Sequence, residues 1–183
     1  MTIRKIARMG HPVLAEKAKE ITNLADPELR RLVEDMVETM IDANGAGLAA
    51  PQVHESIRLV VFQALAHRSD PGLSEAEAYD HTAPLTVLMN PEIEILSGDM
   101  EGGWEGCLSV PGLRGWVERP AHIRYRGLGL DGRSIEREAK GFHARVVQHE
   151  CDHLNGILYP QRMTDLTKLI FESETKHWLE PEE

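Results

Sequence analysis

The residues Gln148-His149-Glu150-Cys151-Asp152-His153-Leu154-Asn155-Gly156 contain the pattern H-E-x-x-H and predict a helix that carries a metal site. At 3.6 residues per turn, His149 and His153 share one face of that helix, where two imidazoles can hold one metal ion. Glu150 lies about 100° further round, beside the ion, where a carboxylate can move protons without serving as a ligand. The pentapeptide also arises by chance, so the interpretation depends on a third ligand.

The sequence offers several sources for that ligand. In the metzincin pattern H-E-x-x-H-x-x-G-x-x-H a third histidine follows, but this chain matches only through Gly156 and carries Tyr159 at the last position, which disfavours that class of protease. A zinc peptidase of the thermolysin type would take a carboxylate from a later helix, and Glu172 or Glu174 could serve. The remaining candidate lies upstream, at Cys107.

Length and composition indicate one soluble globular domain over residues 1–183, with 42% hydrophobic residues. The formal net charge of −10, without a basic run, argues against nucleic-acid binding. No apolar run approaches membrane-spanning length, and no secretory or transit segment is expected. Of the two cysteines, Cys151 lies about 200° from His149 on the helix and should point into the core. A reducing, cytoplasmic location is the default expectation.

A first amphipathic helix is predicted to begin at Asp26-Pro27, an N-cap followed by a proline at the first helical position, and to end at Asn44-Gly45. Its apolar residues recur at i, i+3 and i+4 spacing: Leu29, Leu32, Val33, Met36, Val37, Met40 and Ile41. Residues 45–52 then satisfy G-x-G-x-x-A, but they follow a helix rather than a strand, which excludes a dinucleotide-binding loop. Closely spaced glycines instead favour a loop whose backbone approaches a neighbouring strand or a ligand.

Strands are predicted from β-branched and alternating apolar runs at 57–62, 86–89 and 93–96, and as a hairpin around Asp131-Gly132 at 123–130 and 135–139. Residues 63–83 are expected to form a surface loop. The metal-site helix should begin near Gly141 or Phe142, and a last helix should begin at Asp165. The fold class is therefore α+β: mixed or antiparallel strands around a central metal-binding helix, with an amphipathic helix in the N-terminal half and a C-terminal helix.

Three stretches together resemble the peptide deformylase family: GAGLAAPQ at 45–52, EGCLS at 105–109 and QHECDH at 148–153, in the family's order. The resemblance implies a metal-dependent hydrolase that removes the formyl group from N-terminal formyl-methionine of newly made polypeptides and releases formate. It implies that one catalytic divalent metal is ligated by Cys107, His149 and His153. It also implies that Glu150 is the general acid/base and that Gln52 and the backbone N–H of Leu108 bind the reacting oxygen.

The residue chemistry agrees with these implied roles. One thiolate and two imidazoles leave a tetrahedral ion with an open position, so a metal-bound hydroxide could attack the formyl carbon while Glu150 moves the protons. The donor set accepts several divalent ions. The family implies Fe²⁺, with Zn²⁺, Ni²⁺ or Co²⁺ as substitutes. A non-catalytic metal-stabilised module, in which Glu150 is incidental, stays open as an alternative.

The resemblance also implies an apolar pocket for the methionine side chain. By position, its lining would be Gly45, Ala46, Val146 and His149, with Arg114 at the rim, and Gly47 would leave room for the substrate backbone. Formyl-methionyl nascent polypeptides are the implied partners, and transient association with the ribosome is an expectation from the family alone. The acidic C-terminal end of the chain does not support docking through a basic helix.

Overall fold

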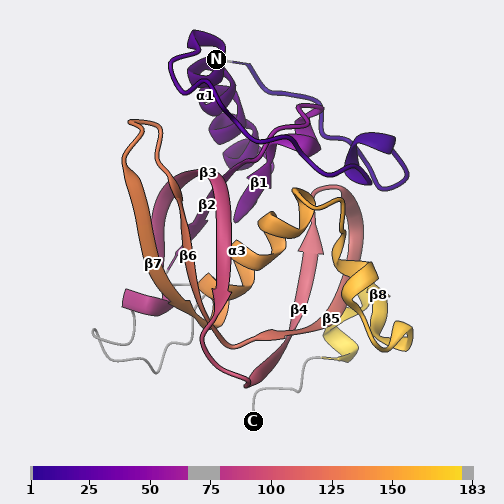
Figure 1. Cartoon of the computed structure of the whole chain (residues 1–183). Coiled ribbons are helices and arrows are strands. Elements are labelled where there is room, and N and C mark those ends of the chain that lie inside the picture. Colours follow the sequence, from indigo (N-terminus) through magenta and orange to yellow (C-terminus); the bar gives the residue numbers. More distant parts are fainter. Residues whose placement is uncertain (1, 66–78, 179–183) are drawn as a thin grey trace.

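The central helix of the molecule is α3 (Gly141–His153), which forms where the H-E-x-x-H pattern predicts it. The structure is a computed structural model that describes residues 2–65 and 79–178. Gly141 begins the helix with φ +52°, a conformation that favours glycine, and a Cβ there would lie 2.5 Å from His81 Nδ1. Past His153 the chain turns, and Gly156 adopts φ +72°. Most side chains of α3 are buried, because the helix lies between two sheets (Figure 1).

The larger sheet is antiparallel and has five strands in the order β1-β2-β3-β6-β7. Their bounds are Gly47–Ala49, Leu59–Ala64, Ala83–Ile95, His122–Leu128 and Ser134–Lys140. Both faces of β2 are covered, which explains its unbroken apolar run. Val60 and Phe62 pack in the core that includes α3, whereas Leu59 and Val61 pack in the core that includes α1. The predicted hairpin is β6 with β7, and it is confirmed.

Helix α1 (Pro27–Asp42) is confirmed close to its predicted bounds, and the Asp26 side chain caps it by accepting a hydrogen bond from the Glu28 N–H. Its apolar stripe packs against the face of the sheet opposite α3, except for Ile41, which is 59% exposed. None of the helices in the described ranges is both long enough and apolar enough to cross a membrane. Most of the predicted 63–83 loop lies outside the described residues.

The two strands predicted on either side of Asn90 form one strand, β3. Asn90 adopts φ +48°, and the register with β6 shifts between Met89 and Glu92. The Asn90 side chain accepts a hydrogen bond from the Ile21 N–H and donates one to the Ile21 carbonyl, at 2.9 Å each. The irregularity is therefore a kink that a neighbouring segment stabilises, and pairing continues through it.

The smaller, three-stranded sheet was not predicted from the sequence. It consists of β4 (Met100–Cys107), β5 (Val110–Pro120) and β8 (Leu169–Phe171), all antiparallel. Its first two strands are rich in glycine and charged residues, so they lack the alternation that identifies strands. Trp104 pairs with Trp116 across this sheet, and their rings meet edge to face. β4 ends next to α3 (Figure 1), and its last residue, Cys107, contacts His153 of that helix.

The predicted C-terminal helix from Asp165 is wrong. The segment forms a 3₁₀ turn at Leu166–Lys168, strand β8, and a second 3₁₀ segment at Glu172–His177. The helical apolar spacing did not identify a buried face, since Leu166 is 66% exposed. Pairing of β8 with Leu113–Gly115 of β5 satisfies the backbone instead, so tertiary contacts overrode local propensity.

Candidate metal centre

Cys107, His149 and His153 meet where the end of β4 approaches α3. Their ligand atoms all lie within 4.8 Å of one another, and Cys107 Sγ is 3.3 Å from His153 Nε2. Within residues 2–65 and 79–178, no other group of three His, Cys, Asp or Glu residues comes together in this way. Glu172 and Glu174, the alternative ligands, are outside the group; Glu172 pairs with Arg114 and Glu174 with His177 instead. A site of the thermolysin type is therefore not formed.

The His149 imidazole is oriented as a metal ligand would be, and His153 presents its Nε2 to Cys107. His149 Nδ1 lies 2.8 Å from Glu105 Oε2; a carboxylate accepts, so Nδ1 carries the proton and Nε2 keeps its lone pair. His153 is fully buried, and its Nδ1 has no hydrogen-bond partner among the described residues. A half-buried thiol with two buried imidazole nitrogens is a donor set typical of Zn²⁺ or Fe²⁺ sites with one open position. The residues present therefore fit a divalent metal.

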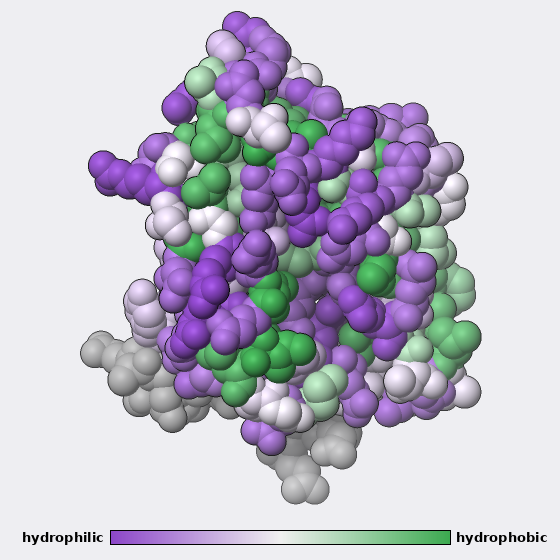
Figure 2. Space-filling model, viewed as in Figure 1, coloured by the Kyte–Doolittle hydropathy of each residue, from purple (hydrophilic) through white to green (hydrophobic). Residues whose placement is uncertain are grey.

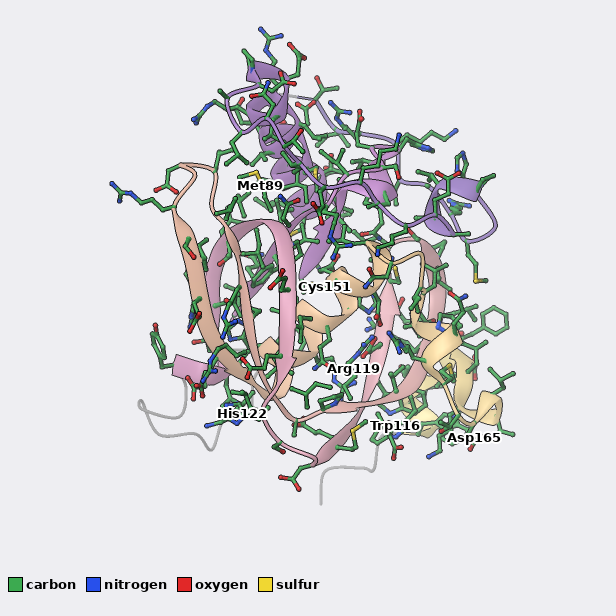
Figure 3. The ribbon with its side chains drawn as sticks, in the orientation of Figure 1. Met89, Trp116, Arg119, His122, Cys151 and Asp165 are labelled. Carbon is green, nitrogen blue, oxygen red and sulfur yellow. The ribbon has the colours of Figure 1, made fainter. Side chains whose placement is uncertain are left out.

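Glu105 connects this centre to a buried ion network. Its carboxylate accepts two hydrogen bonds from Arg119, at 2.6 and 2.9 Å, and one from Arg145 at 2.9 Å. Burial opposes ionisation of Glu105, but the hydrogen bonds from Arg119 and His149 outweigh it and hold the pKa of this carboxyl well below its usual range. Arg119 lies between the smaller sheet and α3 and also binds Asp152 at 2.9 Å (Figure 3). The network fixes Glu105, and through it the His149 ring.

Glu150 is buried beside the two histidines, and its Oε2 has no hydrogen-bond partner in the described part of the chain. Burial raises the pKa of Glu150 to about 7, the range in which a carboxyl can both accept and return a proton at neutral pH. A Cβ on Gly47 would lie 2.3 Å from Glu150 Oε1, so the position facing this carboxylate requires glycine. The close backbone approach predicted for residues 45–52 is thus made to Glu150 and to β2, with which Gly47–Ala49 pair as β1.

Gln52 is held on the other side of Cys107. Its Oε1 accepts a hydrogen bond from the Ala49 N–H at 2.8 Å, which fixes the amide so that Nε2 faces Ser109 Oγ at 3.1 Å and Cys107 Sγ at 3.5 Å. Gln52 is 1% exposed. Its amide N–H is therefore a fixed, uncharged donor next to the candidate metal ligands.

A pocket of about 410 Å³ opens onto these residues. The residues singled out in the sequence as substrate-binding all line it: Gly45, Ala46, Gly47, Arg114 and Val146. Phe142 and Leu108 contribute apolar wall, and Arg145 lies in the wall as well. Gln52, Cys107, His149 and Glu150 also line the pocket, whereas His153 does not. Most of the surface seen in Figure 2 is hydrophilic, in line with the net charge of −10.

The roles of Glu105 and Arg119, and the ion pair of Arg145 with Glu105, were missed in the sequence. Glu105 precedes Cys107 by two residues at the end of β4, so its closeness to the ligand was available as a signal, although the register with β5 shifts between the two. Arg145 precedes His149 by one helical turn, so its place near the ligand face was available as a signal. Arg119 gave no local signal, because only the pairing of β4 with β5 brings it to Glu105.

Comparison with known proteins agrees with the motifs and the geometry. Residues 3–169 match the family model for polypeptide deformylase. Peptide deformylase 2 of Bordetella bronchiseptica is 54% identical over 168 residues, covering 91% of this chain and 90% of that protein. Peptide deformylase 1 of Nitrosomonas europaea is 49% identical over 166 residues, covering 91% and 90%.

A solved structure shares the fold. The class I type b peptide deformylase of Acinetobacter baumannii, bound to Met-Ala-Ser, superposes with a TM-score of 0.77 at 38% identity and covers 88% of this chain and 99% of that one. Deformylases are metal-dependent enzymes that remove the formyl group from the N-terminal formyl-methionine of new polypeptides. The family match, the identity over nine-tenths of the chain and the cluster of Cys107, His149 and His153 lead to one conclusion: this chain belongs to the peptide deformylase family.

Proposed function

We propose that Cys107, His149 and His153 hold one divalent metal and that Glu150, Gln52 and the backbone N–H of Leu108 carry out deformylation of formyl-methionyl peptides around it. The observation that carries this proposal is the approach of the three ligand atoms to within 4.8 Å beside a buried carboxylate with an unpartnered oxygen. When bound, the metal would polarise the formyl group and lower the pKa of water, which supplies a nucleophile at neutral pH.

Glu150 is proposed to move the protons. Its Oε2 is buried and makes no hydrogen bond to the described residues, so it is available to accept a proton from the attacking water. With its pKa raised to about 7, the same carboxyl can give that proton to the nitrogen that leaves as a free amine. Gly47 lets the substrate approach this carboxylate closely, because any side chain there would meet it.

Gln52 and Leu108 are proposed to stabilise the oxygen that gains charge as the formyl carbon becomes tetrahedral. Fixed N–H donors aimed at such an oxygen lower the barrier because they need no reorganisation during the reaction. Gln52 Nε2 is fixed by the bond that its Oε1 accepts from Ala49. Leu108 follows Cys107 directly and lines the same pocket, so its backbone would be fixed once Cys107 binds the metal.

The pocket lined by Gly45, Ala46 and Val146 is proposed to seat the side chain of formyl-methionine, with Arg114 at its rim. Met-Ala-Ser, the peptide bound to the Acinetobacter enzyme, supports a methionine in that position. We propose Fe²⁺ as the metal in the cell, with Zn²⁺, Ni²⁺ or Co²⁺ as possible replacements, since a thiolate with two imidazoles suits all of them. Activity on nascent chains would take place in the cytoplasm and involve transient encounters with the ribosome.

A formate-release assay tests the proposal. The full chain, purified without oxygen and analysed for metal, is expected to release formate from formyl-Met-Ala-Ser and no acetate from acetyl-Met-Ala-Ser, since deformylases remove formyl groups. Equal rates on both peptides would argue for a general amidase. No release from either peptide by metal-loaded protein would refute the proposal.

A further inference from the structure

Arg145 is a buried cation in the wall of the substrate pocket, and deformylation of formyl-methionine as proposed above gives it no role. It is 8% exposed and lines the pocket together with Phe142, Val146 and His149 of the same helix. One turn of α3 separates Arg145 from His149, so the wall that carries the guanidinium adjoins the metal centre. An apolar side chain would complete such a wall at lower cost, because a buried charge must be paired.

The position is built to hold a guanidinium. Arg145 Nη1 donates to Glu105 Oε1 and to the Val117 carbonyl, both at 2.9 Å, and Nη2 donates to the Glu101 carbonyl at 2.7 Å. Gly103 makes the space, because a Cβ there would lie 2.8 Å from Arg145 Cζ and Nη2. Acceptors from β4 and β5 and the absence of a side chain at Gly103 therefore fix the group against the smaller sheet.

The guanidinium is not fully used by the protein. Among acceptors in the part of the chain that the structure describes, Arg145 makes three hydrogen bonds, and a guanidinium has five N–H groups. The buried part of its ion network is balanced in charge. Two arginines, Arg119 and Arg145, pair there with two carboxylates, Glu105 and Asp152, whereas Arg162, which also binds Asp152, is 47% exposed. An uncharged oxygen acceptor entering the pocket would find N–H donors that the described residues leave unused.

We propose that Arg145 is a specificity-determining residue that binds an oxygen on the N-terminal side chain of the substrate, so that the enzyme deformylates chains whose first residue is methionine sulfoxide as well as methionine. The inference rests on the proposed function, since it assumes that this side chain enters the pocket. Oxidation adds one strong acceptor to a side chain of nearly the same size. In an apolar pocket that oxygen would lose its water without replacement, whereas Arg145 offers a charge-assisted hydrogen bond.

A neutral acceptor suits the pocket better than an acidic side chain. Arg145 is already paired with Glu105, so a second carboxylate would approach that one as a like charge. The other walls, formed by Ala46, Leu108 and Val146, would not solvate an ion. The sulfoxide oxygen carries a partial negative charge, but the group has no net charge. It can therefore accept hydrogen bonds from one or two free N–H groups of Arg145 without adding a second anion beside Glu105.

The test compares three substrates on the same metal-loaded protein: formyl-Met-Ala-Ser, its methionine sulfoxide form, and its norleucine form, which has no acceptor. We expect the wild-type chain to deformylate the sulfoxide peptide within about threefold of the methionine peptide. Arg145→Met should lower kcat/KM for the sulfoxide peptide relative to norleucine by roughly tenfold, the size of one lost hydrogen bond to a charged group. Arg145→Gln, which keeps an amide donor, should recover part of that ratio.

A ratio of two substrates is unaffected by the fraction of variant that folds or binds metal, so destabilisation by Arg145→Met does not obscure the result. Arg133→Met is the matched control: it removes a guanidinium that is 88% exposed and does not line the pocket, so it should leave the ratio unchanged. Calorimetry with the product peptides Met sulfoxide-Ala-Ser and Met-Ala-Ser gives a readout independent of turnover and should show the same preference.

Two outcomes would overturn the inference: an unchanged sulfoxide-to-norleucine ratio in Arg145→Met, or wild-type discrimination against the sulfoxide of a hundredfold or more. Both are distinguishable from failure of the proposed function, because formyl-Met-Ala-Ser would still be deformylated. If no formylated peptide released formate, the proposed function itself would fail.

Discussion

Cys107 and Glu150 lie close together in the metal centre, but Cys107 is proposed to bind the metal and Glu150 to move protons. Single substitutions can distinguish these two roles. Cys107→Ala removes the sulfur donor and should reduce metal affinity by more than the roughly 10–100-fold that loss of a supporting hydrogen bond causes. Glu150→Ala leaves all three ligand atoms in place, so metal content should be retained while turnover falls by roughly 10²–10⁴-fold. Metal analysis after dialysis, together with formate release, measures both. Undiminished turnover by Glu150→Ala would refute its assigned role.

His143 gives the fold a pH dependence that can be measured away from the metal. It is fully buried; its Nδ1 donates to the Asp80 carbonyl at 2.9 Å, so its Nε2 accepts from the Tyr125 hydroxyl at 3.2 Å. Burial lowers the pKa of His143 to about 4, below the value near 6.5 expected when unfolded. Between those values the unfolded chain binds the extra proton, so His143 stabilises the fold above about pH 6.5 and this contribution is lost as the pH falls towards 4.

The size of that effect is bounded by the shift, at most about 3 kcal/mol. Urea unfolding of the wild type and of His143→Gln at pH 7.5 and pH 5 measures it. The wild type should lose more free energy of unfolding than the variant between these two pH values. Equal losses would mean that His143 is not the titrating group, and comparison within one pH interval cancels the contributions of other residues.

At the scale of elements, β1 and α3 approach so closely that one glycine decides whether they fit. Gly47→Ala would place a Cβ 2.3 Å from Glu150 Oε1, so the carboxylate would have to move. Metal content should be retained, whereas formate release should fall by roughly 10²-fold, the usual cost of displacing a reacting group by about 1 Å. Gly98→Ala is the control, because its Cβ meets nothing within 4 Å. Full activity in Gly47→Ala would show that Glu150 has room to shift without consequence.

At the scale of the whole molecule, the metal would join parts of the chain that are otherwise held by the ion network. Cys107 belongs to the smaller sheet, whereas His149 and His153 belong to the helix packed on the larger sheet. A ligand that binds only the folded state adds about 4 kcal/mol at roughly 1,000 times its Kd, which for a chain of 183 residues raises the melting temperature by about 10 °C. Removal of the metal by a chelator should therefore lower the melting temperature by about 10 °C.

Cys107→Ala provides the control for that measurement. Without tight metal binding, its melting temperature should be nearly the same with and without chelator. Scanning calorimetry of the wild type and of Cys107→Ala, each with and without chelator, measures these melting temperatures. An equal loss on chelation in both would show that Cys107 does not hold the stabilising ion.

The sequence by itself determined the elements whose signals are local. Helix α1 follows from its cap and its apolar spacing, α3 from the histidine pattern, and the β6–β7 hairpin from alternation around Asp131-Gly132. The three motifs pointed to the family, and the family model matches residues 3–169. The ligand and catalytic roles of the individual residues stay predictions until the variants are measured.

Only the tertiary structure decided the rest. The smaller sheet contains the hairpin of β4 with β5, whose strands lack the alternation that identifies strands, and β5 also pairs with β8, which is distant in sequence. That distant pairing is the reason why the expected C-terminal helix is a strand and two 3₁₀ turns. The partners of Glu105 and the buried position of Arg145 likewise follow from that sheet meeting α3. The preference of a segment for helix or strand depends on neighbouring residues, whereas burial and ion pairing depend on which surfaces of the folded chain come together.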